Sequence, residues 1–455
     1  MGEGKSMENI DVLLMNVPTN RGYKKELADV ISMPPLGVLY LASHIKKSGY
    51  KVEIMDMAVD FYKKKEFITI LKDKNPKIVG ISTFVESWSA MKVLADSIKQ
   101  ALPNAVIVGG GACATFCYEQ LLKELKYDYV IFGEGEYAFA DLCDALIKKQ
   151  MDIRKVKGIS YLIEGNIHLT EKKERIKDLD QLEIPSRNLI DLKKYVYPIT
   201  ISTSRGCPGE CIFCSSKSFW GKEIYFRSPQ NILYEILQVE KEYSINMFFI
   251  IDDAFTMNVK RAMEFCDLLK ATNKKFIWGC ESRADVASEI LLQSLYDAGC
   301  RKIQFGMESA NNEILRKIGK HVTVEQIENA VKIASKIGFD INVSFILGHP
   351  FDTHETVQQT IIFALKLREM YKANVFGSIL TPYPGTQLYN NAEEYGIKIL
   401  TKDWDKFTMD NAIINTKHLT AFDLREYYQR FVNVLLGKSR MFVAPTITKK
   451  RKSVL

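Results

Sequence analysis

The chain has little of what membrane and secreted proteins need. None of its apolar runs approaches the roughly 20 residues that cross a bilayer, and no basic-then-apolar leader opens it. Its nine cysteines are an odd number and three of them share one short loop, so a disulfide scaffold is not expected. These absences predict a protein of a reducing, oxygen-poor cytoplasm.

Acidic residues are missing from the C-terminal segment 437–455. That segment carries six basic residues, which are Lys438, Arg440, Lys449, Lys450, Arg451 and Lys452. Because the whole chain has a net charge of +7, the rest of it carries only +1, and no nucleic-acid partner is expected. We interpret the basic tail as a solvated terminus, with contact to an anionic membrane as the less favoured alternative.

Three cysteines stand close together in a loop rich in glycine and proline. Cys207, Cys211 and Cys214 follow the spacing C-x3-C-x2-C, and the next cysteine along the chain is Cys266. A structural zinc site takes four ligands, and neither a histidine nor a fourth cysteine lies near, so zinc is disfavoured. Electron-transfer clusters also use four cysteines. Three thiolates therefore predict a [4Fe–4S] cluster whose fourth iron stays open for another ligand.

The first 150 residues alternate short apolar runs with amphipathic helical patterns, which is typical of a parallel α/β sheet. The expected strands begin near Val12, Lys51, Ile78, Ala105 and Tyr129. Five strands and their helices predict a doubly wound, flavodoxin-like domain over 1–150. Residues 151–195 are predicted to be a linker that contains a small hairpin around Glu164-Gly165.

From 196 to 395 the alternation restarts and gives six β/α units. The expected strands begin near Ile199, Met247, Phe276, Lys302, Ile341 and Val375. Six units are too few to close an eight-stranded barrel, so we expect an open, partial TIM-like barrel. Active sites of such sheets lie at the C-terminal strand ends, and the cysteine loop directly follows the first strand. The segment 396–455 should hold one helix before the basic tail.

Polar side chains gather at the predicted C-terminal ends of these strands. They are Asp252, Asp253, Glu281, Arg283, Glu308 and Ser309, with Ser344 inside the fifth strand. Each alone could belong to a strand-end salt bridge. Their common position on the side of the cysteine loop favours one shared site instead.

The cysteine spacing, with Phe213 directly before the last cysteine, resembles the radical S-adenosylmethionine (SAM) superfamily. The segments 249–256, 306–309 and 345–350 resemble the branch of it that carries an N-terminal cobalamin-binding domain. The resemblance implies that the open iron chelates SAM and that the cluster cleaves it reductively to a 5′-deoxyadenosyl radical. It also implies an external one-electron reductant of the flavodoxin or ferredoxin type.

The same resemblance implies a set of SAM contacts. The expected residues are Phe213, Asp253, Glu281, Arg283, Glu308, Ser309 and Ser344. Arg283 suits the carboxylate of SAM, Glu308 suits the ribose or the amine, and Phe213 would bracket the adenine. Many members have a Gly-Gly-Glu run where this chain has Asp252-Asp253-Ala254, so the partner of the amine stays open.

Three segments of the first domain, 34–37, 108–111 and 133–136, resemble the cobalamin-binding family. The expected cobalamin contacts are Leu36, Gly37, Ser82, Thr83, Phe84, Gly109, Gly110, Gly111, Glu134 and Gly135. Small residues at strand ends let a backbone approach a bulky tetrapyrrole. The Asp-x-His-x-x-Gly motif is absent, since Ala42 precedes His44 at the aspartate position, which implies a cobalt without a protein histidine. A flavodoxin-like domain kept only for packing is the alternative.

Together these features predict a cobalamin-dependent radical SAM enzyme that methylates an unactivated carbon through methylcobalamin. The substrate would be a small molecule or a peptide, and its specificity would depend on loops such as 381–386. One alternative is a radical SAM enzyme that cyclises, rearranges or oxidises without methyl transfer. Another is a corrinoid and iron–sulfur protein of electron transfer or sensing. Analysis of the products formed from labelled SAM would distinguish these three functions.

Overall fold

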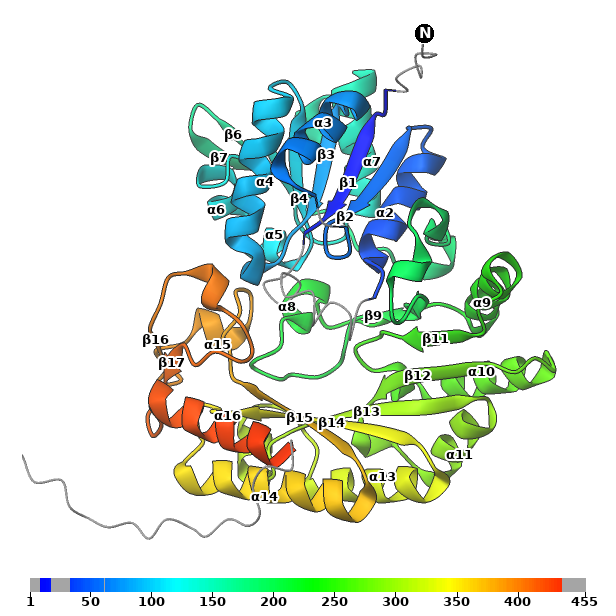
Figure 1. Ribbon diagram of the computed structural model, residues 1–455, viewed down its shortest axis with the longest axis vertical. Helices are drawn as coiled ribbons and strands as arrows, with labels where there is room; N and C mark the ends of the chain where they lie inside the picture. The colour runs from blue at the N-terminus through cyan, green and yellow to red at the C-terminus, as the bar shows by residue number, and fades with distance from the viewer. Residues whose placement is uncertain (1–8, 18–32, 61, 436–455) are drawn as a thin grey trace, which may run out of the picture.

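The computed structural model describes residues 9–17, 33–60 and 62–435. Two α/β domains are stacked, with the strand ends of the first facing the open side of the second (Figure 1). No helix in these ranges is both long and apolar enough to span a bilayer. The basic tail, and with it the interpretation given above for its charges, lies outside the described residues.

The first sheet has the order β2-β1-β3-β4-β5-β6-β7, and its first five strands are parallel. These strands are β1 (Val12–Asn16), β2 (Val52–Asp56), β3 (Ile78–Ser82), β4 (Val106–Gly110) and β5 (Tyr129–Ile131). The helices are α2 (Leu36–Lys47), α3 (Lys64–Lys74), α4 (Trp88–Ala101), α5 (Ala112–Phe116), α6 (Tyr118–Lys123) and α7 (Glu136–Cys143). Separate apolar cores fill the two faces, so the predicted doubly wound domain is confirmed.

The hairpin predicted in the linker is present but belongs to the first sheet. Its strands β6 (Ile159–Ile163) and β7 (Asn166–Leu169) are antiparallel, and β6 pairs with β5. The inward residues Ile159 and Tyr161 are buried in the same core as Ile131. The sheet therefore extends past residue 150, the predicted end of the domain, because β6 pairs edge to edge with β5 and adds its inward side chains to the same core.

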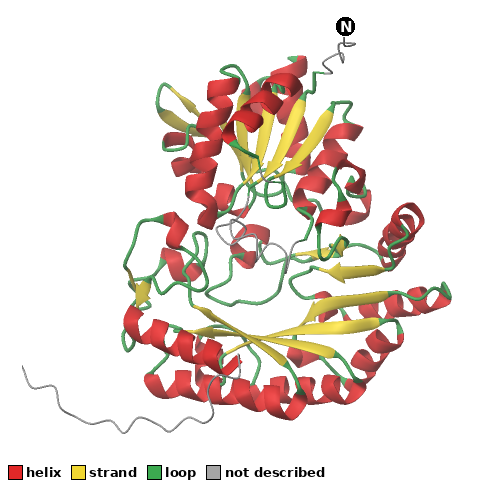
Figure 2. Ribbon diagram, in the orientation of Figure 1, coloured by secondary structure: helices red, strands yellow, loops and turns green. Residues whose placement is uncertain are grey.

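The second sheet is an open, parallel arrangement of six strands in the order β15-β14-β13-β12-β11-β8. The strands are β8 (Thr200–Ile201), β11 (Met247–Ile250), β12 (Ile277–Ser282), β13 (Cys300–Glu308), β14 (Asp340–Leu347) and β15 (Asn374–Ile379). The main outer helices are α9 (Pro229–Tyr243), α10 (Val259–Ala271), α11 (Glu289–Asp297), α13 (Val324–Ile337) and α14 (His354–Tyr371). Figure 2 shows these helices on the outer face of the sheet, which confirms the partial barrel.

Local sequence signals explain where several of these helices begin and end. In α13, Thr323 and Gln326 form a reciprocal capping box, and Gly338 ends the helix in the left-handed conformation at φ +106°. In α9, Ser228 caps the first turn and Pro229 follows it, where a missing amide proton costs nothing. These signals fix the strand-to-helix turns that present the site.

Short elements outside the repeating units shape the space above the barrel. They are β9 (Ser204–Arg205), β10 (Tyr225–Phe226), α8 (Ser216–Trp220), α12 (Asn312–Lys317), α15 (Gln387–Asn390), β16 (Lys398–Ile399) and β17 (Ile414–Asn415). The predicted C-terminal helix is α16 (Ala421–Leu435), which packs on edge strand β15. There Gly377 allows the close approach of Phe431, since a Cβ would lie 2.6 Å from that ring.

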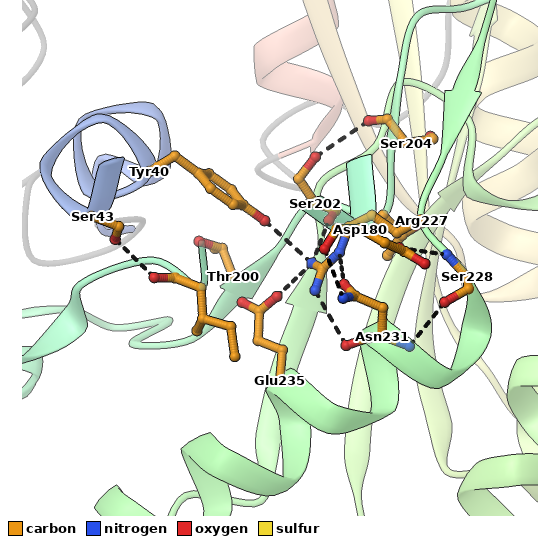
Figure 3. A network of polar contacts seen from close by, with 12 residues as sticks. Tyr40, Ser43, Asp180, Thr200, Ser202, Ser204, Arg227, Ser228, Asn231 and Glu235 are labelled. Atoms are coloured by element: carbon orange, nitrogen blue, oxygen red, sulfur yellow. Dashed lines mark hydrogen bonds and ion pairs between the residues drawn. The ribbon is translucent and has the colours of Figure 1, made fainter. Parts of the chain in front are cut away.

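Polar contacts join the two domains. Tyr40 of α2 accepts a hydrogen bond of 3.2 Å from Arg227, which also forms a buried ion pair with Glu235 of α9 (Figure 3). Nearby, the Tyr195 hydroxyl donates to Asp56 at 2.6 Å. The first domain is thereby held directly over the barrel.

Candidate active site between the two domains

A cavity of about 580 Å³ lies where the C-terminal strand ends of the first sheet face the second domain. The first domain contributes residues 33–38, Tyr40, Leu41, the ends of β3 and β4, and the turn 133–136. The second domain contributes Ser202, residues 204–206, Phe219, Trp220 and residues 251–253. This position between β1 and β3, where the strand order reverses, is where doubly wound sheets bind cofactors.

Glycines leave room along the first-domain wall of this cavity. A Cβ added at Gly37, Gly110 or Gly135 would meet no atom within 4 Å. All three glycines line the cavity. The wall is thus a smooth backbone cradle that a bulky planar ligand could approach closely, and side chains at these positions would fill it.

Eight of the ten residues predicted to contact cobalamin line this cradle. They are Leu36, Gly37, Ser82, Phe84, Gly110, Gly111, Glu134 and Gly135. Thr83 and Gly109 do not line it, and their contact with cobalamin stays a prediction. The Thr83 hydroxyl donates to the Gly110 carbonyl at 2.9 Å, and Gly109 faces Tyr127, whose ring would lie 3.0 Å from an added Cβ. Both residues thus contact the protein beneath the cavity wall.

The three cysteines lie in the loop between β9 and α8, beside the cavity. Backbone amides of Gly209 and Ser216 donate to the sulfurs of Cys207 and Cys214 at 3.4 Å each. Burial raises the pKa of all three thiols, to about 11 for Cys214, so binding of iron would have to displace their protons. These amides would remain as donors to the thiolates.

Within the described ranges, no three cysteine, histidine or acidic side chains converge to hold one metal ion. This is compatible with a [4Fe–4S] cluster, because each cysteine there binds a different iron and the sulfurs need not converge. The loop of Cys207, Cys211 and Cys214 therefore fits the predicted cluster by donor type and spacing.

Arg283 faces the cysteine loop as predicted, but its side chain already has partners. Its Nη1 would lie 3.6 Å from a Cβ added at Gly209. The guanidinium donates two hydrogen bonds of 3.0 Å to Asp285 and one of 3.1 Å to the Lys320 carbonyl. These contacts hold the arginine in place beside the loop.

Glu308 ends β13 in a strained conformation and pairs with a lysine that sequence reasoning missed. Its φ is +69°, which is rare for a residue with a side chain and is often found at functional sites. Its carboxylate lies 3.0 Å from the Nζ of Lys320, and both side chains are largely buried. Burial alone would lower the pKa of Lys320, but Glu308 and Cys211 raise it.

Lys320 gives no sequence signal because it follows a short helix instead of a strand. Gly319, at φ +72°, brings this turn against the cysteine loop, where an added Cβ would lie 2.5 Å from the Glu210 carbonyl. The Gly319 carbonyl also lies 3.7 Å from the Cys211 sulfur. Only the folded chain brings this lysine to the site.

Two further carboxylates face the same region as Glu308. Burial raises the pKa of Glu281 to about 7, and the charges of Asp253 and Glu308 add to that effect. Asp253 accepts a hydrogen bond of 2.5 Å from the Ser216 hydroxyl, just after Cys214. Three neighbouring carboxylates, balanced chiefly by Lys320, suit a cationic ligand such as the sulfonium and ammonium groups of SAM.

The remaining predicted SAM residues differ in their surroundings and in their exposure. The Phe213 ring packs on the buried ring of His349 at 5.6 Å, beside the cysteines. Ser344 is partly exposed in β14 next to Gly306. Ser309 is 1% exposed and its hydroxyl accepts from the Asn311 amide at 3.3 Å, and its contact with SAM stays a prediction.

Comparison with known proteins gives the family of this chain. Residues 31–143 match the family model of the B12 binding domain, and residues 201–364 match that of the Radical SAM superfamily. An uncharacterized methyltransferase of Pyrococcus horikoshii is 34% identical over 420 residues, which cover 91% of this chain and 90% of that protein. The chain belongs to the B12-binding branch of the radical SAM superfamily.

Two other matches agree with this membership. An anaerobic magnesium-protoporphyrin IX monomethyl ester cyclase of Rubrivivax gelatinosus is 28% identical over 442 residues, 93% of this chain and 77% of that protein. The cobalamin-dependent SAM radical enzyme OxsB, solved with aqua-cobalamin, superposes with a TM-score of 0.68 at 23% identity. That alignment covers 86% of this chain and 56% of OxsB, so the chain spans little more than half of the OxsB length. The likeness to OxsB supports the fold.

The predicted cofactors of this radical SAM protein are confirmed at the level of the family. Its two domains are those that bind cobalamin and that use a [4Fe–4S] cluster with SAM. The first domain is therefore a cobalamin-binding domain, which replaces the alternative of a domain kept only for packing. The assignment of single residues to each cofactor stays a prediction.

Proposed function

We propose that this radical SAM protein methylates an unactivated carbon of a small-molecule substrate. The observation that carries the proposal is that one cavity joins both sets of predicted cofactor residues. Gly110 and Gly135 of the cobalamin cradle line it from one side, and Asp253 of the predicted SAM site lines it from the other. A methyl donor and a substrate radical must meet in such a shared space.

The chain's own residues would prepare this space. When bound, the cluster would supply the electron that cleaves SAM, and cobalamin would supply the methyl group. The acidic side chains of Asp253, Glu281 and Glu308 would orient the cationic SAM, and Lys320 would hold Glu308 in place through their ion pair. Phe219 and Trp220 add apolar surface to the cavity wall, which favours the exclusion of water from a radical.

We also propose a flavodoxin- or ferredoxin-type protein as the electron donor and an oxygen-poor cytoplasm as its setting. A peptide remains an alternative substrate, because loop 381–386 and the C-terminal segment carry no side-chain chemistry that would select one class. No nucleic acid is expected.

A second candidate reaction is radical chemistry without methyl transfer. It is favoured by the relative from Rubrivivax gelatinosus, whose name is that of a cyclase. The third candidate, a protein of electron transfer or sensing, would bind the same cofactors without turnover.

The deciding experiment uses SAM with a deuterated methyl group. The anaerobically reconstituted protein would be incubated with this SAM, a reductant and a small-molecule extract of cells that lack the gene. A product with the methyl label supports methylation, and 5′-deoxyadenosine with an altered but unlabelled product supports the second candidate. If neither forms beyond the Cys211→Ala control, the methylation proposal is wrong and the third candidate takes its place.

A further inference from the structure

Arg205 forms two buried ion pairs that cross from the second domain to the first. Its Nη1 lies 2.5 Å from a carboxylate oxygen of Glu134, and its Nη2 lies 2.5 Å from one of Glu136. All three side chains are at most 10% exposed. The two carboxylates and the one guanidinium thus form a charged contact that is shielded from solvent.

The two glutamates belong to the cobalamin cradle. Glu134 lies between Gly133 and Gly135 in the turn that lines the cavity, and it also accepts the Ile176 amide at 2.8 Å. Glu136 is the first residue of α7, where the helix N-terminus favours a negative charge. Arg205 is therefore the ion-pair partner of the cradle turn itself.

The backbone of Arg205 belongs to the other cofactor site. Arg205 is in β9, two residues before Cys207. Arg175 donates to the carbonyls of Arg205 and Glu223 at 2.9 and 2.6 Å and so holds β9 to the strand that follows. The intervening Gly206 has φ +111° and packs on the Glu223 carbonyl, 2.8 Å from an added Cβ. A displacement of the Arg205 backbone would consequently also displace Cys207 and the rest of the cysteine loop.

We propose that Arg205 is a positioning residue that couples the cysteine loop to the cobalamin cradle, so that filling the cradle orders the loop that carries the cluster ligands. The proposal rests on the proposed function, because it needs a corrinoid in the cradle. A planar guanidinium can hold two carboxylates at once, whereas a lysine presents one compact charge. Without the arginine, two like charges would face each other in the cavity wall, and the turn would rearrange to reach water.

Amide hydrogen exchange of the cluster-free protein tests this coupling without a substrate. Residues 209–216 do not line the cavity, so a corrinoid held there is not expected to shield their amides directly. In the wild type, hydroxocobalamin should slow their exchange about fivefold or more, a typical coupling between linked sites. In Arg205→Lys that slowing should be lost, while hydroxocobalamin still binds with an affinity within about tenfold of the wild type.

Arg187→Lys is the matched control. Arg187 forms an equally buried ion pair with Glu235 at 2.6 Å, but it touches neither the cradle turn nor the cysteine loop. This variant should keep the slowing over 209–216. Glu136→Gln preserves shape and provides a second test if Arg205→Lys does not fold, since it should weaken the same slowing.

Retention of the slowing in both Arg205→Lys and Glu136→Gln would overturn the coupling role. A wild type that binds hydroxocobalamin but shows no slowing over 209–216 would also overturn it, and would leave the proposed function intact. A wild type that does not bind hydroxocobalamin would instead contradict the proposed function.

Discussion

At the scale of single residues, the charges around the cysteine loop depend on partners that are distant in sequence. Glu308 is paired with Lys320, and Arg283 is held by Asp285 and by the Lys320 carbonyl. Glu281 has no basic partner within hydrogen-bond reach among the described residues, and burial raises its pKa to about 7. Replacement of Cys211, Arg283 or Glu281 should therefore change a different measured quantity in each case: SAM cleavage, SAM binding or the pH dependence of stability.

Replacement of Cys211 by Ala should abolish reductive cleavage of SAM. The reconstituted wild type should hold about four irons per chain, because we predict that the three-cysteine loop holds a [4Fe–4S] cluster. Iron content and 5′-deoxyadenosine formation measure the effect. Cys266→Ala, in the buried core of the barrel, is the control that should retain both. Retained cleavage in Cys211→Ala would contradict the cluster assignment.

Replacement of Arg283 by Ala should weaken SAM binding roughly ten- to a hundredfold, since a buried charge-assisted contact is worth about 1.5–3 kcal/mol. Binding of hydroxocobalamin should change little, because Arg283 does not line the cavity of the cradle. Equilibrium titration of both ligands measures the two effects. An equal loss of both would mean that Arg283 is a structural brace.

Replacement of Glu281 by Gln should alter how stability depends on pH. The folded pKa of about 7 lies above the ordinary value of 4.5, so between these values the folded state binds more protons than the unfolded state. The unfolding free energy of the wild type should thus fall as pH rises through this window, by at most about 3 kcal/mol. The variant should lack this decline and be the more stable protein at pH 8.

Melting temperatures of wild type and Glu281→Gln at several pH values between 4.5 and 8 measure this difference. Glu264→Gln, which removes an exposed carboxylate on α10, is the control and should follow the wild type. If the difference in melting temperature between Glu281→Gln and wild type stays constant with pH, Glu281 does not have a raised pKa in the folded protein.

At the scale of elements, the end of β4 decides whether a corrinoid can approach the first sheet. Its last two residues are both glycines, yet only Gly110 faces open space, whereas Gly109 packs on Tyr127. Because successive strand residues point to opposite faces, the two positions cannot share a role.

Replacement of Gly110 by Phe should block binding of hydroxocobalamin while the fold survives, because the new side chain would enter the cavity and not the core. Absorption spectra during a titration measure binding, and melting temperature checks the fold. Thr69→Phe on the exposed face of α3 adds the same bulk away from the cavity and should bind normally. Unchanged binding by Gly110→Phe would contradict the cradle.

At the scale of the whole molecule, the loop 381–386 closes the two domains against each other. We predicted this loop to carry specificity, and the structure adds a packing role, because Gly385 lies against the Phe116 ring of α5. An added Cβ would lie 2.3 Å from that ring, and φ is +84°. Glycine permits both the close approach and the left-handed backbone.

Replacement of Gly385 by Ala should destabilise the protein by about 1–3 kcal/mol, through backbone strain and overpacking. Thermal unfolding of the apo protein measures the loss. Phe116→Leu in the same chain should restore part of it, since the smaller side chain gives room but leaves the strained φ. If Gly385→Ala is as stable as the wild type, the loop is not packed against α5 in solution.

The sequence by itself determined the class of the fold, and it singled out the loop that we predict to bind the cluster. Alternating apolar runs and helical patterns are local properties, so both parallel sheets and the C-terminal helix could be predicted. The spacing of Cys207, Cys211 and Cys214 is also local, and it limits the chemistry that three thiolates can support. The glycines of the cradle could also be predicted, because they belong to short local segments: Gly110 ends β4, Gly135 lies shortly after β5, and Gly37 lies in the first turn of α2.

Only the tertiary structure decided which of those residues face the site. Alternation along β4 directs Gly110 toward open space and Gly109 toward Tyr127, and Ser309 is buried at 1% exposure. Folding brings Glu308 to Lys320 within the second domain. It also brings Glu134 of the first domain to Arg205 of the second. Ion pairs between distant segments have no periodicity along the chain, so no local pattern could have predicted them.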